Sequence, residues 1–415
     1  MINVAIQALT LLCALLVNFV IPALYGLELY GAFIQANILV FLFQKLADIS
    51  TEPLIGHVDH ASIFPVSMLL ATLVWLIFWA IDAAVSLGSV ALLAAMLLSS
   101  SVMLSMYALR QQRRLVGYLV FFLVVFFTLL VLKERFGWAL SIVDILFWTN
   151  LVPAMLAALA LLRSGMRLPS RQEFAPLLAS VGRMVPGNFS MTLVFNLFTN
   201  LLPYILSKTL PLRDLGLFRV VTAVIQSATS IFPVNTKAIF VRLVGSDDRA
   251  GLFRVLLAWS LLYFAGLGML ALTAGSVDAR LMPFLALVGS LPTLYWAVLA
   301  ERYLQAMKQR GPLMRANLVV GGVALATAFL VKTIDQAVIF YAIGLSVYAG
   351  WLIFLCRRQV NLPAAVLVIG VAPLAVELQP DSVIYPAAYF VGMLLLAWSV
   401  FKPGLADLGR MRGHP

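Results

Sequence analysis

The chain has 415 residues, of which 63% are hydrophobic and only 11% are charged. Soluble domains are about 45–50% apolar and about 25% charged, so this composition excludes an ordinary soluble domain and indicates an integral membrane protein. The formal net charge of +11 does not indicate nucleic-acid binding. The Lys and Arg residues gather in short connections between apolar segments, where such residues determine membrane topology.

Apolar segments follow one another along the whole chain. With about 20 residues per membrane span, the sequence predicts about 14 transmembrane helices. They cover residues 2–24, 30–50, 62–84, 87–108, 116–132, 139–162, 184–208, 215–240, 255–273, 281–300, 313–330, 337–355, 362–378 and 384–401. The first segment lacks a basic start and an A-x-A site, so we interpret it as a retained span. The predicted fold is an all-α polytopic membrane protein.

The longest connection, residues 163–183, is basic and divides the chain into two halves. We expect an N-terminal six-helix bundle at 1–162, a cytoplasmic linker at 163–183 and a C-terminal six-helix bundle at 184–355. Residues 356–415 are expected to add a helix pair and a cytoplasmic tail. Lys and Arg are more frequent in the connections on the side that also carries both termini, so both termini are predicted to be cytoplasmic.

The second helix of each predicted half begins with a related sequence. ELYGAFIQANILVFLFQKLADISTE (28–52) aligns with RDLGLFRVVTAVIQSATSIFPVNTK (213–237), so that Gly31 pairs with Gly216 and Phe33 with Phe218. Repeated halves are common in secondary transporters, whose substrate site lies between them. The repeat therefore predicts two pseudo-symmetric bundles around a central cavity.

Polar side chains form stripes on four of these helices, numbered 1, 2, 7 and 8 in the predicted order. At 100° per residue, Arg219, Gln226 and Lys237 share one helix face, and Asn37, Gln44 and Asp48 share another. A Lys or Asp at mid-bilayer costs about 2.5–3.5 kcal/mol, so such stripes are expected to face a protein interior or a wet cavity. The candidate cavity residues are Lys45, Arg219, Lys237, Asn18, Asn37, Gln44, Asn188, Asn196 and Gln226.

Three short segments carry a resemblance to a known family: LYGLELYGAF (24–33), KLADIS (45–50) and LPLRDLGLFRV (210–220). They resemble the polysaccharide flippases of the O-antigen (Wzx) type, chiefly in the Gly-x-Phe entry to predicted helices 2 and 8. The superfamily also holds the multidrug and toxin extruders (MATE) and the peptidoglycan lipid-precursor flippase. The resemblance covers most of the chain in topology, and about 14 spans suit the flippases better than the twelve usual in drug extruders.

The resemblance implies a cavity lined by helices 1, 2, 7 and 8. It implies transport of undecaprenyl-diphosphate-linked oligosaccharide from the cytoplasmic to the periplasmic leaflet of the bacterial inner membrane, in O-antigen, lipopolysaccharide or exopolysaccharide biosynthesis. The expected partners are this substrate, membrane lipid and the glycan polymerase machinery, with no cofactor and no metal. Lys and Arg suit a diphosphate because charge-assisted hydrogen bonds strengthen at low dielectric. Lys45 and Lys237 are expected to attract the diphosphate from the cytoplasm and Arg219 to receive it nearer the periplasm, while amides suit sugar hydroxyls.

Simpler roles for these residues stay open. Lys45 and Asp48 lie three residues apart and would neutralise each other on one helix face. Lys237 and Arg219 would snorkel to the membrane interfaces, and the amides of helix 7 would join helices by hydrogen bonds. Asp48 and Asp144 are candidates for ion coupling, although Asp144 also suits the role of an interface acid.

Other functions are also open from the sequence. A cation-coupled drug or metabolite extruder would carry acids rather than Lys and Arg on the cavity helices, and a polysaccharide polymerase or ligase would need a sizeable periplasmic domain. A channel is disfavoured by the repeated halves. The chain has no G-x-x-x-x-G-K-[ST] motif for ATP hydrolysis, and the spacing of His57, Asp59 and His60 matches no zinc pattern.

Overall fold

The computed structural model is helical throughout the residues that it describes, and no β-strand occurs among them. The described residues are 2–51, 62–81, 87–109, 111–163, 179, 194, 201–228, 243, 246–277, 282–362, 388 and 391–400. Contacts divide the chain into two units, Met1–Val220 and Val221–Pro415. The predicted bundle boundaries at 162 and 184 stay a prediction, because most of the residues between them lie outside the described part.

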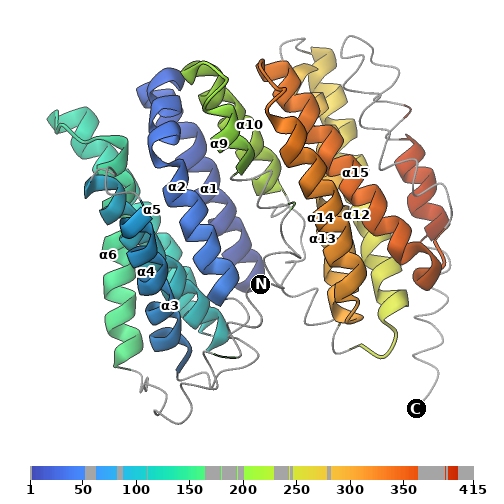
Figure 1. The fold of residues 1–415 in the computed structure, drawn as a ribbon, viewed down its shortest axis with the longest axis horizontal. Helices are drawn as coiled ribbons and strands as arrows, with labels where there is room; N and C mark the ends of the chain where they lie inside the picture. The colour runs from blue at the N-terminus through green and yellow to red at the C-terminus, as the bar shows by residue number, and fades with distance from the viewer. Residues whose placement is uncertain are drawn as a thin grey trace. The chain divides into compact units, whose positions relative to one another are not determined.

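The N-terminal unit consists of long helices that follow the apolar segments closely (Figure 1). They are α1 (Ile2–Tyr25), α2 (Leu27–Thr51), α3 (Ile63–Ile81), α4 (Leu87–Ala108), α5 (Gln112–Phe136) and α6 (Ile142–Leu162), followed by α9 (Leu202–Leu206) and the first part of α10 (Leu212–Ala228). Gly26 separates α1 from α2 with a φ of 84°, a left-handed conformation that glycine adopts without steric cost. The turn between these two helices is therefore one residue long.

Helix α4 lies at the centre of this unit, where it packs against α2, α3 and α6. Its buried face contains many small residues, among them Ser89, Ser99, Ser101 and Ser105. Small residues let helix backbones approach each other, which favours helix association in a membrane. Around α4 a core cluster joins α1, α3, α5 and α6; it consists of Ile6, Phe64, Val102, Met106, Leu115, Tyr118, Leu119, Ala154, Ala158 and Leu161.

The C-terminal unit contains α12 (Arg249–Val277), α13 (Met282–Ala306), α14 (Arg310–Ala328) and α15 (Ile334–Val360). Helix α13 packs against the other three and buries Tyr295, Trp296 and Tyr303 completely. Buried polar groups join the helices: Trp296 Nε1 donates to Ser260 Oγ at 3.0 Å and Asn317 Nδ2 to the Tyr348 hydroxyl at 2.7 Å. These two bonds join α12 to α13 and α14 to α15 through buried side chains.

Eight of the described helices are long and apolar enough to cross a membrane. The predicted count of about 14 spans is not confirmed, because large parts of the predicted segments 184–208, 215–240 and 362–378 lie outside the described residues. The chain is a multi-pass membrane protein with an all-helical fold.

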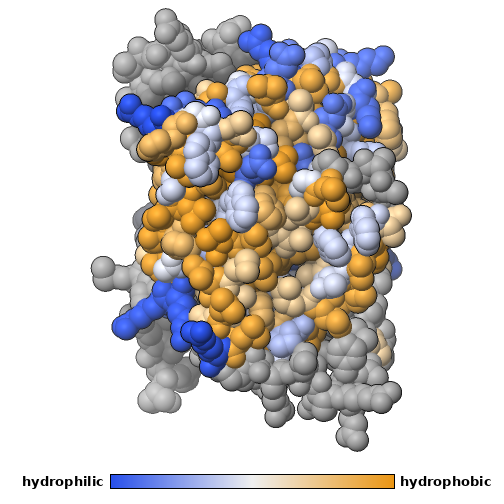
Figure 2. All heavy atoms as spheres, turned by 90° about the vertical axis from the view of Figure 1, so that its left-hand side faces the viewer, coloured by the Kyte–Doolittle hydropathy of each residue, from blue (hydrophilic) through white to orange (hydrophobic). Residues whose placement is uncertain are grey.

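The outer faces of α5 and α6 are apolar where a membrane would contact them. The exposed side chains of α5 include Val120, Val124 and Phe127, and those of α6 include Leu156 and Leu159. Figure 2 shows this side of the molecule, where apolar residues form a broad area with hydrophilic residues toward the upper and lower edges. Such a surface suits the hydrocarbon core of a bilayer.

Candidate functional site

Helices α2 and α10 cross at the two glycines that the sequence repeat pairs. A Cβ atom on Gly31 would meet the Leu212 carbonyl group and lie 3.2 Å from the Gly216 nitrogen. A Cβ atom on Gly216 would meet the Leu27 carbonyl group and lie 3.2 Å from the Gly31 nitrogen. Leu27 and Leu212 each lie directly before one of the two aligned segments, so the contact is reciprocal, as in a two-fold interface. Only glycine allows backbones to approach this closely.

A cavity of about 370 Å³ lies beside this crossing, inside the N-terminal unit. Its walls come from α1, α2, α4, α5, α6 and α10. The residues that line it are Thr10, Cys13, Ala14, Val17, Asn18, Tyr30, Phe33, Ile34, Phe41, Gln44, Met96, Ser99, Met103, Tyr118, Leu119, Phe122, Leu146, Asn150 and Arg219. Three of the predicted cavity residues, Asn18, Gln44 and Arg219, are among them.

Arg219 is the only residue with a formal charge among the described residues that line the cavity. It lies on α10, three residues after Gly216, and its guanidinium group is 5.8 Å from the centroid of the Phe41 ring on α2. That distance lies within the range of a cation–π interaction. The half-buried guanidinium is thus oriented toward α2 by an aromatic ring.

Hydroxyl and amide groups surround the rest of the cavity and are oriented by hydrogen bonds. The Tyr30 hydroxyl donates to Asn18 Oδ1 at 3.1 Å, and Asn18 Nδ2 donates to the Ala14 carbonyl at 2.7 Å. On the opposite helices the Ser99 and Tyr118 hydroxyls lie 2.6 Å apart. These groups keep further donor and acceptor capacity, so the cavity offers neutral polar contacts together with one cation.

Two further residues of the predicted stripe on α2, Asn37 and Asp48, contact α4. Asn37 is 2% exposed and its Oδ1 accepts a hydrogen bond of 2.7 Å from Ser89, while Asp48 Oδ1 accepts one from Ser100. Both pairs are separated by 52 residues along the chain. Helices α2 and α4 therefore run parallel in one register over this length, and Asn37 lies between helices rather than on the cavity wall.

Lys45 is exposed near the end of α2. Among the described residues Lys45 and Asp48 form no direct ion pair, and Asp48 accepts a hydrogen bond from Ser100. Their mutual neutralisation stays a prediction. Lys45 is accessible from outside the cavity, which suits attraction of an anion rather than its enclosure.

Asp144 has a structural role at the start of α6. Ser141 is the N-cap residue: its backbone N–H donates to Asp144 Oδ2 at 2.9 Å, and its side chain accepts a hydrogen bond of 3.2 Å from the Asp144 backbone N–H. This reciprocal arrangement is a capping box, which satisfies two otherwise unpaired N–H groups. Coupling through Asp144 stays a prediction.

Replacing Ser141 by alanine is expected to lower the unfolding free energy by about 0.5–2 kcal/mol, because the cap of α6 is lost. Thr128→Ala is the matched control, since the exposed Thr128 hydroxyl bonds only to the Val124 carbonyl of its own helix. Its effect is expected to stay within about 0.5 kcal/mol. Thermal unfolding of the purified variants measures both, and equal losses for the two would contradict the assigned cap.

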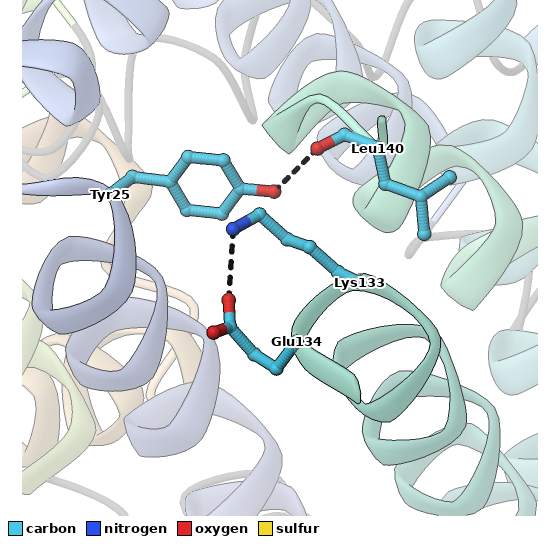
Figure 3. A network of polar contacts seen from close by, with 4 residues as sticks. All are labelled: Tyr25, Lys133, Glu134 and Leu140. Atoms are coloured by element: carbon cyan, nitrogen blue, oxygen red, sulfur yellow. Dashed lines mark hydrogen bonds and ion pairs between the residues drawn. The ribbon is translucent and has the colours of Figure 1, made fainter. Parts of the chain in front are cut away.

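The end of α1 is attached to the α5–α6 connection by a small polar network (Figure 3). The Tyr25 hydroxyl donates to the Leu140 carbonyl at 2.7 Å, and the Lys133 ammonium lies 4.4 Å from the centroid of the Tyr25 ring. Lys133 also pairs with Glu134 at 2.9 Å. The network fixes the turn between α1 and α2 to the remainder of the unit.

Several predicted residues lie outside what the structure describes. Lys237, Asn188 and Asn196 are outside the described residues, and so is the sequence around His57. Gln226 lies in α10, but its side chain is not described. Among the described residues no group of three or more His, Cys, Asp or Glu side chains is arranged to hold a metal ion.

The sequence did not predict the other polar residues of the cavity, namely Thr10, Tyr30, Ser99, Tyr118 and Asn150. The last three lie on α4, α5 and α6, which are not among the four helices with predicted polar stripes. Glu301 was also missed. It lies on α13 and is the only Asp, Glu, Lys or Arg among the buried residues of the described part, at 4% exposure. A test for ionisable residues just beyond each predicted span would have found it.

Comparison with solved structures finds a chain described as "Lipid II flippase MurJ, inward closed conformation". The TM-score is 0.59 at 11% sequence identity, and the alignment covers 98% of this chain and 99% of that chain. No family model matches the sequence, and no curated protein matches it. At this identity the match shows the fold alone, so this chain has the fold of the chain described as a lipid II flippase. The match does not single out the O-antigen branch.

Proposed function

We propose that this protein is a flippase for polyprenyl-diphosphate-linked glycan. Its substrate is undecaprenyl-diphosphate-linked oligosaccharide, which it moves from the cytoplasmic to the periplasmic leaflet of the bacterial inner membrane by alternating access. The pathway is the assembly of O-antigen or another exported polysaccharide, where a glycan polymerase receives the product. The observation that carries the proposal is the cavity of the N-terminal unit, with Arg219 as the one charged group on its described lining.

The chemistry of the cavity matches the three parts of such a substrate. The planar guanidinium of Arg219 presents paired N–H donors that suit phosphate oxygens. The Asn18 and Gln44 amides and the hydroxyls of Tyr30, Ser99 and Tyr118 suit sugar hydroxyls. Apart from Thr10 and Asn150, the remaining lining is apolar, as an isoprenoid chain requires.

A cation-coupled drug extruder is the main competitor, and the cavity argues against it. A cationic drug would be stabilised by a carboxylate, whereas the described lining contains none and carries Arg219 instead. In the proposed mechanism Lys45 and Lys237 attract the diphosphate at the cytoplasmic side, and Asp48 is the candidate coupling group.

The test is the sidedness of lipid-linked glycan in cells that lack this protein, probed with a glycan-modifying enzyme confined to the periplasm. We expect glycan to accumulate out of reach of the enzyme and to become accessible when the wild-type gene is restored. Glycan that is accessible without the protein but unpolymerised would assign a later enzymatic step. No change in either the accessibility or the polymerisation of the glycan would favour the extruder.

A further inference from the structure

Helix α10 supplies the charged side chain of the described cavity lining, and the other helices supply its neutral side chains. Among the described lining residues, Arg219 alone comes from α10, whereas the neutral ones all come from α1, α2, α4, α5 and α6. A displacement of α10 would therefore remove the cation and leave the amides and hydroxyls in place.

The position of α10 depends on its contact with α2. Gly216 lies three residues before Arg219, and residues three apart are neighbours on a helix surface. The reciprocal approach of Gly31 and Gly216 brings this face of α10 against α2. A second contact lies close by, since Gln35 Nε2 on α2 donates to the Ser207 carbonyl at 2.7 Å, in the connection that precedes α10.

We propose that Gly31 and Gly216 are positioning residues for Arg219, so that docking of α10 on α2 switches the phosphate affinity of the cavity. With the helices docked, the cavity contains a cation and binds a lipid diphosphate. With the helices apart, the same cavity is neutral and releases the diphosphate while it becomes more open. This inference rests on the proposed function, because it assigns Arg219 to the diphosphate, and it adds a cause for release.

The experiment is a double-mutant cycle on the full chain, purified in detergent, with farnesyl diphosphate as the soluble probe ligand. Gly31→Ala and Arg219→Gln are each expected to weaken binding about tenfold, from the loss of charge-assisted hydrogen bonds. The double variant is expected to bind no more weakly than either single variant, since both remove the same interaction. Additive losses, or wild-type affinity in Gly31→Ala, would overturn the proposal.

Gly117→Ala is the matched control, because a Cβ atom there meets nothing within 4 Å. It is expected to bind the probe as the wild type does, and a tenfold loss would overturn the proposal. Gln35→Ala is the second variant if Gly31→Ala does not fold. It removes only the bond to Ser207, and a several-fold loss of affinity is expected that also disappears in the Arg219→Gln background. Unchanged affinity in a folded Gln35→Ala protein would count against the proposal.

The native thiol of Cys13 gives an independent readout, since it lines the cavity while Cys356 is buried. In a Cys356→Ala background, Gly31→Ala is expected to raise the rate at which a maleimide labels Cys13, and an unchanged rate would overturn the proposal. If Arg219→Gln leaves farnesyl diphosphate binding unchanged, the assignment of the diphosphate fails. An increase in labelling would then still show that the crossing controls the cavity.

Discussion

Replacing Arg219 by glutamine is expected to reduce glycan export by about 10- to 100-fold. Charge-assisted hydrogen bonds contribute about 1.5–3 kcal/mol, and about 1.4 kcal/mol corresponds to a factor of ten. The described cavity lining offers no second cation that would compensate. The measurement is the fraction of lipid-linked glycan that a periplasmic modifying enzyme reaches, at equal protein levels in the membrane.

Arg213→Gln is the matched control, since Arg213 lies on the same helix but is exposed and outside the cavity lining. It is expected to retain export within about twofold. Arg219→Lys is expected to be intermediate, because it keeps the charge and loses the paired donors. Export at the wild-type level by Arg219→Gln would reject the assigned site.

Replacing Gly216 by alanine is expected to destabilise the protein by about 3 kcal/mol, the upper part of the range for overpacking. The added methyl group would meet the Leu27 carbonyl, and the Gly31 nitrogen would lie 3.2 Å away. These are backbone atoms, which cannot move aside as a flexible side chain does, so α2 and α10 must separate. Gly31→Ala is expected to behave alike, because the contact is reciprocal.

The same substitution at Gly117 is expected to have the opposite sign. Gly117 lies inside α5 with open space around it, so alanine is expected to stabilise its helix by about 0.5–1 kcal/mol. Thermal unfolding of the three purified variants distinguishes the cases. A lower melting temperature for Gly117→Ala than for Gly216→Ala would contradict the close crossing.

The positions of the helices were largely predictable because an apolar segment of about 20 residues indicates a membrane span. The predicted segment 87–108 coincides with α4. For α5 the expected 116–132 was too short, since the helix runs from Gln112 to Phe136 and ends at Gly137, which is left-handed. The mean hydropathy falls at the charged residues near each end of α5, so the predicted segment is shorter than the helix. The helix continues past them because Lys and Arg side chains can reach toward the membrane interface while the backbone stays helical.

The cavity was only partly predictable, because a polar stripe does not reveal what it faces. Asn37 and Gln44 share a stripe, yet Asn37 bonds to Ser89 on α4 and Gln44 lines the cavity. Helical periodicity orients a side chain relative to its own helix and says nothing about the neighbouring one. Tyr30 was missed for a related reason. An aromatic side chain in an apolar segment predicts a core position, although the Tyr30 hydroxyl donates a hydrogen bond to Asn18.

The repeat was the most informative sequence signal for the site. It paired Gly31 with Gly216 across the two halves, and these glycines meet at the crossing beside the cavity. The pairing indicated that the two helices occupy equivalent places in the two predicted halves. It did not predict that their backbones come into contact, which the structure shows.

The shared register of α2 and α4 determines which parts can carry motion. Asn37 and Asp48 lie 11 residues apart, which is close to three helical turns, and each is bonded to a serine of α4. A single attachment would leave α2 able to rotate about the attached residue. Two attachments about 16 Å apart oppose both sliding and rotation of α2 against α4, so in the proposed release step α2 stays with the N-terminal unit and α10 is the helix that separates from it.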